Sequence, residues 1–431
     1  MKFKSITGTK DLLPAESHRW QYVEQIFREL AHRYNFKEIR TPVFEHTELF
    51  ARGIGELTDI VSKEMYRFED RSGNSLTLKP EMTAAVVRAY LQHNLGQQQP
   101  VTKLYYLAPM FRQERPQKGR LRQFHQFGLE IIGTPGAEAD AEIIVMTADY
   151  YVQLGITNVE LRINSVGCEK CRPQYKEKLK EFLQPNLPHL SEDSQRRFET
   201  NPLRILDSKD DRDRELTADA PLQKDHLCTE CNEHFTHLQE ILDEANIEYS
   251  VDGKIVRGLD YYTKTAFEFI SSALGSQDAL SGGGRYDLLA KEIGGKDVPA
   301  VGVAGGIERL LLVLEASGTE TGEEPHPVVY LAAADNDSRA WLYGITRQLR
   351  KHNIPCDTDL MQRSLKAQMR EASRQHAQYV IIAGSDERKN NEVVVKNMEV
   401  GDQQNVSVDD LVHILQQQLS GEHNATEKSR A

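Results

Sequence analysis

Residues 107–133 read LAPMFRQERPQKGRLRQFHQFGLEIIG, the most informative stretch of this chain. Its middle, from Arg112 to Arg122, carries five basic side chains against one acidic, and an alternating aromatic and polar run then ends at Glu130. Apolar residues on both sides of a loop with Pro and Gly predict two antiparallel strands joined by that loop. Rigid strands beside a cationic loop suit the binding of a polyphosphate and an approach to nucleic acid.

Length and composition limit what the rest of the chain can be. Its 431 residues allow two or three domains, and 39% hydrophobic with 27% charged residues is typical of a globular protein. The sequence has no run of about 18 apolar residues, so we expect no transmembrane helix and no membrane partner. The N-terminal sequence lacks the apolar segment of a secretory signal, which predicts a cytoplasmic protein. A net charge of −12 argues against indiscriminate nucleic-acid binding but leaves room for a local basic footprint, because charges act over roughly 8–10 Å.

Apolar periodicity places most of the remaining elements. It predicts helices over residues 17–34, 80–90 and 138–154, and strands over residues 39–44 and 159–163. Pro42 would lie at an edge or bend of its strand. Residues 168–250 change to short, highly charged helical patterns, which indicate an inserted helical module. A glycine-rich strand at residues 302–306 then runs into an apolar helix.

The C-terminal part has a different pattern, strand–helix–strand–helix–strand, which begins at Val328 after a polar linker. Strands that alternate with helices predict a small α/β domain with a largely parallel sheet. We therefore predict a first domain over residues 1–325 that includes the insertion, an α/β domain over residues 326–421, and a disordered polar tail over residues 422–431.

Two parts of the sequence carry recognisable chemistry. Arg112 on a rigid strand can bind a phosphate bidentately, and Phe124 on the facing strand can stack on a purine ring. An exposed hairpin with solvated charges is the alternative. The glycines of residues 302–306 would let a ligand approach the backbone, and Arg309 would cover the other face of the purine. Close packing of a helix on a strand also selects glycine.

Together with the proline-containing strand after the first helix, these parts resemble the three motifs of class II aminoacyl-tRNA synthetases in order and spacing. Ala304 departs from the usual GxGxGxER form at its middle glycine, without adding a bulky side chain. RGLDYY at residues 257–262 and SGGGRYD at residues 281–287 narrow the resemblance to the histidyl-tRNA synthetases. PEMT at residues 80–83 and QFHQFGLE at residues 123–130 agree, and the likeness runs from about residue 5 to about residue 420.

The resemblance implies an α+β fold, with a class II six-stranded antiparallel sheet and flanking helices, a helical insertion, and a C-terminal α/β anticodon-binding domain. It implies an ATP-dependent ligase that uses ATP and Mg²⁺ to convert L-histidine to histidyl-adenylate and pyrophosphate. The enzyme would then transfer histidine to the 3′ end of tRNA(His). A homodimer is implied as well, since the family's first motif builds a two-fold interface.

The resemblance also assigns site residues. Arg112 and Arg257 would be the catalytic cations, stabilising charge as the carboxylate attacks the α-phosphate. Histidine would contact Glu81, Met82, Thr83, Arg112, Gln126, Glu130, Arg257, Tyr261 and Tyr262; ATP would contact Arg112, Glu114, Arg120, Phe124 and Arg309; the tRNA acceptor end would contact Arg115, Gln117 and Lys118. Recognition of an imidazole demands polar partners, because an analogue without the ring N–H leaves them unpaired. The structural alternatives are a helix N-terminal acid for Glu81 and a core side chain for Tyr261.

Residues 339–374 hold eight basic and three acidic side chains. This excess predicts a phosphate footprint for the anticodon stem of the tRNA. Two solvated helix faces would carry the same charge and are the alternative.

The predicted insertion contains two CxxC pairs, with two histidines close behind the second pair: Cys168, Cys171, Cys228, Cys231, His234 and His237. Paired CxxC motifs indicate a structural, tetrahedral zinc site. Reduced, buried cysteines are the alternative. The resemblance favours that alternative, because the family does not depend on zinc for activity.

A non-catalytic regulatory paralogue of histidine biosynthesis, which keeps the synthetase fold as a binding module, is the competing function. Such proteins generally lack the C-terminal domain and lose the catalytic set. This chain has Arg112, Arg257 and Arg309 together with the extra domain, which argues for the enzyme. The RGLDYY and SGGGRYD stretches argue against a class II synthetase specific for another amino acid.

Overall fold

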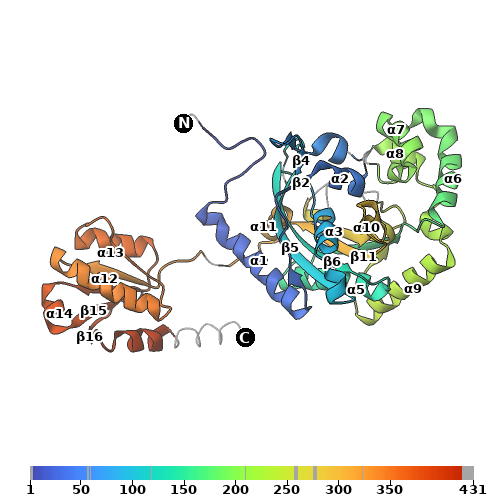
Figure 1. Cartoon of the computed structure of the whole chain (residues 1–431). Coiled ribbons are helices and arrows are strands. Elements are labelled where there is room, and N and C mark those ends of the chain that lie inside the picture. Colours follow the sequence, from blue (N-terminus) through green and yellow to red (C-terminus); the bar gives the residue numbers. More distant parts are fainter. Residues whose placement is uncertain are drawn as a thin grey trace. The chain divides into compact units, whose positions relative to one another are not determined.

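The computed structural model describes residues 3–55, 58, 60–117, 119–208, 210–256, 261–274, 279–322 and 324–419. The chain forms two compact units, Met1–Gly322 and Glu323–Ala431 (Figure 1), and each unit has its own large sheet. Among the described residues, no helix has the length and apolar character needed to cross a membrane.

The predicted hairpin forms two neighbouring strands of the first unit's sheet. β5 (Thr102–Phe111) and β6 (Gln123–Ile132) pair antiparallel along their full length. The strand order is β1-β5-β6-β11-β10-β9-β7-β8. Its six inner strands are antiparallel, which confirms the predicted sheet, and the short β1 and β8 add parallel edges. The other strands are β1 (Lys37–Glu38), β7 (Glu160–Ser165), β8 (Ser250–Val251), β9 (Thr263–Ile270), β10 (Ala279–Arg285) and β11 (Ala300–Gly306).

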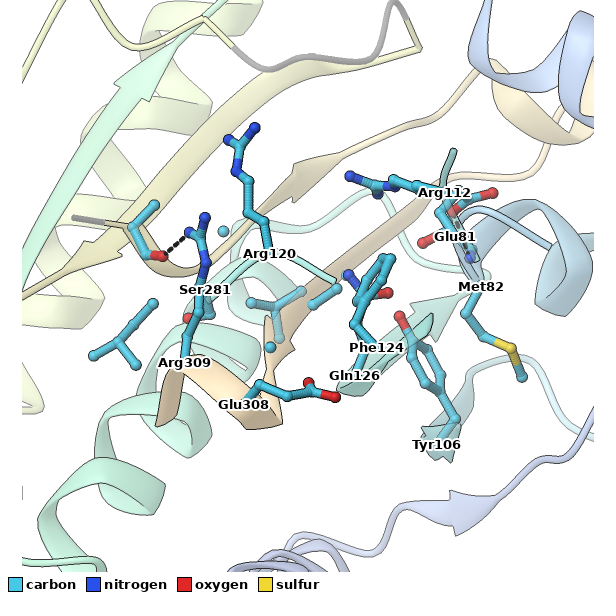
Figure 2. Close-up of a pocket in the computed structure, with 18 of the residues that line it drawn as sticks. Glu81, Met82, Tyr106, Arg112, Arg120, Phe124, Gln126, Ser281, Glu308 and Arg309 are labelled. Carbon is cyan, nitrogen blue, oxygen red and sulfur yellow. Dashed lines mark hydrogen bonds between the residues drawn. The ribbon is translucent and has the colours of Figure 1, made fainter. Parts of the chain in front are cut away.

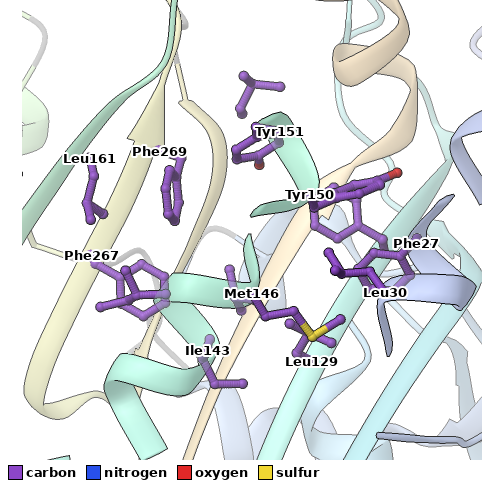
Figure 3. Close-up of a cluster of buried hydrophobic side chains, with 14 of the residues drawn as sticks. Phe27, Leu30, Leu129, Ile143, Met146, Tyr150, Tyr151, Leu161, Phe267 and Phe269 are labelled. Carbon is purple, nitrogen blue, oxygen red and sulfur yellow. The ribbon is translucent and has the colours of Figure 1, made fainter. Parts of the chain in front are cut away.

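Helices cover both faces of this sheet. Outside the insertion they are α1 (Pro14–Arg33), α2 (Thr47–Ile54), α3 (Thr83–Gln92), α4 (Leu95–Gln98), α5 (Ala137–Gln153), α10 (Leu289–Glu292) and α11 (Ile307–Ala316). α1, α5 and α11 pack on one face and enclose the main hydrophobic core. Figure 3 shows part of it, where Phe27 of α1 and Tyr150 of α5 meet with ring centroids 5.0 Å apart.

Side chains of β6 alternate between the two faces, as the period of a strand requires. Phe127, Leu129 and Ile131 join the main core. The intervening residues therefore face the opposite side, where α3 and α10 border a second buried cluster. The alternating sequence of this strand thus separates a structural face from a face available to ligands.

The strand predicted over residues 39–44 is wrong in part. β1 ends at Glu38, and β2 (Phe44–His46) belongs to a separate three-stranded sheet of order β2-β4-β3, with β3 (Arg67–Glu69) and β4 (Ser75–Leu78). Pro42 lies between the two short strands and has no N–H to contribute to a ladder.

The predicted helical insertion lies between β7 and β9. Its helices are α6 (Arg172–Leu183), α7 (Glu192–Thr200), α8 (Asp211–Leu216) and α9 (Thr229–Glu244), and part of the insertion encloses a small core of its own. α9 returns to pack on α5. There His234 Nε2 lies 2.5 Å from the carboxylate of Asp140, which is also 3.2 Å from Arg285 of β10. Asp140 and Arg285 are fully buried, so this network holds the insertion against the sheet through paired buried charges.

The second unit has the predicted α/β pattern around a five-stranded sheet of order β13-β12-β14-β15-β16. β13, β12 and β14 are parallel, and β15 and β16 add an antiparallel edge. The bounds are β12 (Val329–Ala333), β13 (Cys356–Thr358), β14 (Tyr379–Ala383), β15 (Glu392–Asn397), β16 (Gln403–Ser407), α12 (Asn336–Lys351), α13 (Leu365–Arg374) and α14 (Ser385–Asn390). Residues 411–419 are helical, and the tail predicted to be disordered lies outside the described residues.

Candidate active site

A cavity of about 250 Å³ opens on the ligand-facing side of the large sheet. In Figure 2, Arg112 and Glu81 lie at one end of the cavity, Arg120 and Arg309 lie at the other, and Phe124 lies between them. The structure brings together most of the predicted histidine and ATP residues on its wall: Glu81, Met82, Thr83, Arg112, Glu114, Arg120, Phe124, Gln126, Tyr261, Tyr262 and Arg309.

The first end of the cavity combines a carboxylate and a guanidinium. Glu81 accepts the backbone N–H of Thr83 at 2.7 Å and that of the next residue at 3.0 Å, so it also caps α3, as the structural alternative predicted. Arg112 donates to the Pro80 carbonyl at 2.9 Å, and its guanidinium lies 5.2 Å from the centroid of the Phe124 ring. Burial raises the pKa of Glu81 and lowers the pKa of Arg112, since each charged form loses water. A zwitterionic ligand would supply each group with an opposite charge.

The second end presents two cations. Arg120 lies 3.3 Å from the carboxylate of Glu114. Arg309 donates to the carbonyl of Ala279 at 2.7 Å and to that of Gly119 at 3.3 Å, which ties α11 to β10 and to the basic loop. Guanidinium groups beside an apolar ring suit a nucleotide with its phosphates.

Glu130 lies beneath the cavity wall and is fully buried. Its carboxyl group accepts hydrogen bonds from the hydroxyl of Thr83, at 2.7 Å, and from that of Tyr286, and both donors line the cavity. Gly302 on the neighbouring strand provides the space, because a Cβ there would lie 1.7 Å from Glu130 Oε2. Burial raises the pKa of Glu130 to about 8, and the two hydroxyl donors lower it only in part. The carboxyl group is therefore mostly protonated at neutral pH.

Gln126 lines the cavity and has an unpaired hydrogen-bond acceptor. Its side-chain oxygen is buried, and no group in the described part of the chain donates a hydrogen bond to it. Such an unpaired acceptor costs about 1–3 kcal/mol. A ligand N–H or ammonium in the cavity would satisfy it.

Several wall residues were not predicted: Tyr106, Ser281, Tyr286 and Glu308. Tyr286 directly follows β10 and lies in the SGGGRYD stretch. Tyr106 pairs in register with Gly128, where a Cβ would lie 2.3 Å from the tyrosine hydroxyl. Gly128 opposite Tyr106 was the sequence feature that could have indicated Tyr106 as a wall residue. It can be used only once the register of the two strands is known.

Tyr261 is both a core residue and a wall residue. It is 2% exposed, and its ring packs edge-on against Tyr286 at 5.6 Å and tilted against Tyr262 at 4.8 Å.

The predicted residues Arg257 and Lys118 lie outside the described residues.

Arg115 and Gln117 are exposed on the loop between β5 and β6 and do not line the cavity. Their position beside a ligand-sized opening suits contact with a larger partner. In the second unit, the excess of basic residues is partly neutralised, because Arg339, Arg363 and Arg374 pair with Asp359 or Glu371.

The four cysteines of the CxxC pairs meet in space, with all their sulfur atoms within 4.8 Å of one another. The two neighbouring histidines are engaged elsewhere. His234 contacts Asp140 at 2.5 Å, and His237 contacts Glu138 at 3.1 Å and Glu240 at 3.2 Å. The cluster is thus formed by thiols alone.

Comparisons with known proteins agree with this geometry. A family model described as histidyl-tRNA synthetase matches residues 8–310, and one described as an anticodon binding domain matches residues 328–418. The histidine–tRNA ligase of Caldanaerobacter subterraneus is 49% identical over 95% of this chain and 99% of its own length. That of Acetivibrio thermocellus is 46% identical over 94% of this chain and 97% of its own length.

Solved structures give the same result. The apo histidyl-tRNA synthetase of Staphylococcus aureus superposes with a TM-score of 0.81 at 37% identity, covering 96% of this chain and 99% of that one. A Bacillus halodurans protein described as an ATP phosphoribosyltransferase regulatory subunit/histidyl-tRNA synthetase has a TM-score of 0.64 at 22% identity. It covers 89% of this chain and 99% of its own, and at this identity the likeness shows a shared fold alone.

Proposed function

The chain belongs to the histidyl-tRNA synthetase family, and from this premise we propose how its cavity performs the reaction. It is a histidine–tRNA ligase, an ATP-dependent aminoacyl-tRNA synthetase with the class II fold. The match over nearly the whole chain carries this conclusion. The regulatory paralogue is less supported, because the predicted ATP residues Arg112 and Arg309 line one cavity and a C-terminal anticodon-binding domain follows.

We assign the end of the cavity with Glu81 and Arg112 to the backbone of histidine. Its α-ammonium would meet Glu81 and the unpaired oxygen of Gln126, and its carboxylate would meet Arg112 and Arg257. The opposed charges of Glu81 and Arg112 and the unsatisfied acceptor of Gln126 support this orientation.

The imidazole would then enter the polar pocket over Glu130. One ring nitrogen would bind at the carboxyl group of Glu130, beside the hydroxyls of Thr83 and Tyr286, and the other at the hydroxyl of Tyr262. Met82 and Tyr261 supply apolar walls. A fully buried carboxyl group gives specificity because a side chain without a polar ring nitrogen could not hydrogen-bond to it.

In the first step, an oxygen of the histidine carboxylate attacks the α-phosphorus of ATP. A P–O bond forms, and the bond from the α-phosphorus to the bridging oxygen breaks, releasing pyrophosphate. Arg112 and Arg257 would stabilise the charge at the α-phosphate. Phe124 and Arg309 would hold the adenine ring between them.

Two further residues would position the nucleotide, and a metal ion would assist them. Glu114 would contact the adenine and Arg120 the outer phosphates. The wall carboxylate Glu308 would fit Mg²⁺, which takes oxygen ligands and is held largely by phosphates and water. When bound, Mg²⁺ neutralises charge on the phosphate oxygens.

In the second step, the terminal ribose hydroxyl of the tRNA attacks the carbonyl carbon of histidyl-adenylate, and AMP leaves. Arg115, Gln117 and Lys118 of the basic loop would contact the acceptor end. The anticodon stem would contact exposed basic residues of α12 and α13 that are not part of the ion pairs described above: Arg347, Lys351, Lys366 and Arg370. Deleting residues 326–431 should abolish tRNA charging and leave adenylate formation intact.

We propose a homodimer joined at the small three-stranded sheet. Val43, Phe44 and Phe68 are 41%, 52% and 43% exposed there, and the two phenylalanine rings lie 6.2 Å apart. Contiguous exposed apolar side chains mark interaction surfaces. Phe44→Asp should give a monomer in analytical ultracentrifugation, and an unchanged dimer would place the interface elsewhere. The cytoplasm, where tRNA is charged, is the proposed location.

Amino-acid-dependent ATP–pyrophosphate exchange tests the assignment directly. Each of the twenty amino acids is supplied in turn, and exchange is expected with histidine alone. Exchange with a different amino acid, and none with histidine, would overturn the proposed specificity. Charging of tRNA(His) transcripts then tests the second step separately.

A further inference from the structure

Four thiols from two distant segments meet at the base of the insertion. Cys168 and Cys171 follow β7, and Cys228 and Cys231 lie at the start of α9. Sulfur–sulfur distances are 3.9 Å within the first pair, 3.7 Å between Cys168 and Cys228, and 3.9 Å between Cys171 and Cys231. Cys171 and Cys231 are buried, and the other two are half-buried.

These distances match one tetrahedral metal ion. Four bonds of about 2.3 Å from a central ion separate the sulfur atoms by about 3.8 Å. Disulfides would bring each pair to about 2 Å. An iron–sulfur cluster would hold some of its four cysteines further apart, because they bind more than one iron atom. With four protein ligands, such a site is closed and structural rather than catalytic.

Backbone N–H groups around the cluster donate hydrogen bonds to the sulfur atoms. The N–H of Cys168 donates to Cys171 Sγ at 3.3 Å, and the N–H of Lys170 donates to Cys168 Sγ at 3.4 Å. Cys171 and Cys228 are the N-cap residues of α6 and α9, whose N-termini attract negative charge. Lys170 adds a nearby positive charge.

We propose that Cys168, Cys171, Cys228 and Cys231 bind one structural Zn²⁺, which joins the start of the insertion to the start of its last helix, beside the histidine end of the cavity. Zinc is the ion that four thiolates in this geometry favour. The site lies outside the reaction described above. Only its effect on histidine affinity rests on the proposed function.

The cluster reaches the cavity through the residue that follows Cys171. Arg172 donates to the carbonyls of Val166 and Gly167, each at 3.1 Å, and to the carbonyl of the cavity residue Tyr262. Loss of the metal would release this arginine and loosen the backbone of Tyr262.

Two ion pairs strengthen the same connection. Glu230, between the cysteines of the second pair, binds Lys170 at 3.1 Å and Lys264 of β9 at 2.9 Å. The N–H of Lys264 in turn donates to the carbonyl of Gly167 at 2.8 Å. The two CxxC segments and β9 are therefore held as one unit.

Metal analysis of protein purified without chelator tests the site. We expect about one zinc per chain in the wild type and in Cys356→Ser, a matched control with a buried cysteine in the second unit, and loss of zinc in Cys228→Ser. Cobalt replacement should give the absorption bands of a tetrahedral thiolate complex. Zinc well below one per chain in folded wild type, or iron in its place, would overturn the zinc site. This result does not depend on the folding of a variant.

The positional effect needs a second measurement. Zinc is removed from the wild type with a chelator and a thiol-reactive mercurial, and is then restored after the thiols are released. We expect removal to raise KM for histidine about tenfold and to change KM for ATP much less, with recovery on zinc addition. If the wild type holds one zinc per chain but its KM for histidine stays the same after zinc removal, the link to Tyr262 is refuted while the metal site stands. An enzyme specific for another amino acid would refute the proposed function instead.

Discussion

The buried carboxyl group of Glu130 should make the stability of the first unit depend on pH, and Glu130→Gln should remove that dependence. Folding raises the pKa of Glu130 from 4.5 to about 8, chiefly through burial. Its contribution to stability is complete below pH 4.5 and is lost as pH rises toward 8, because the unfolded chain ionises first. At 1.36 kcal/mol per pKa unit, the loss is about 3 kcal/mol at pH 7 and about 5 kcal/mol above pH 8.

The chain offers a convenient assay. It has two tryptophans, of which Trp20 packs in the core of the first unit and Trp341 belongs to the second. In a Trp341→Phe background, fluorescence follows urea unfolding of the first unit alone. Glu130→Gln should match the parent near pH 5 and exceed it progressively up to pH 8–9. Glu29→Gln, which alters an exposed carboxylate of α1, is the control.

The same residue should shape the pH dependence of histidine binding. Above about pH 6.5, the ordinary pKa of imidazole, the histidine ring is neutral. Below about pH 8, the pKa of Glu130, the carboxyl group is protonated. Between these two values the ring and the carboxyl group together hold one titratable proton. KM for histidine should be lowest in this window and rise on both sides, and Glu130→Gln should lose the alkaline limb. Parallel stability curves for Glu130→Gln and its parent, together with a flat KM from pH 7 to 9, would refute the reasoning.

Three further predictions test other parts of the molecule. Arg257→Ala should abolish pyrophosphate exchange while far-ultraviolet circular dichroism stays unchanged, and near-normal exchange would contradict its catalytic role. Asp140→Ala should destabilise the first unit by about 3–5 kcal/mol in the fluorescence assay, because Arg285 loses its fully buried partner; a change below about 1 kcal/mol would mean that the network carries little energy. Gly302→Ala should lower the free energy of unfolding by about 1–3 kcal/mol or more, because the new Cβ would clash with the buried Glu130. Gly344→Ala has no atom within 4 Å of its Cβ and should stabilise its helix by about 0.5–1 kcal/mol. Equal effects of the two alanines on urea midpoints would contradict the packing argument.

Much of the fold could be predicted because it depends on local patterns. The alternating run predicted a strand that ends at Glu130, and β6 carries Phe124, Gln126 and Glu130 on the face opposite the main core. Gly and Pro placed the loop of the hairpin correctly. The one partial error, the strand over residues 39–44, arose because apolar alternation outweighed the missing N–H of Pro42.

The cavity itself depends on residues that local patterns cannot bring together. Tyr106 and Tyr286 were missed because their role depends on strand register and on neighbours far along the chain. The pKa of Glu130 likewise follows from burial, which no sequence period specifies. The spacing of the cysteines left zinc and free thiols as alternatives, whereas the folded chain brings all four sulfur atoms together.

The sequence by itself determined the order of elements, the family and the set of residues available for chemistry, because periodicity and motif spacing are properties of short segments. Only the tertiary structure decided which side chains share the cavity, which of them are buried, and that the two CxxC pairs meet. These features depend on contacts between segments far apart in the chain, and such contacts exist only after the sheet has closed over its core.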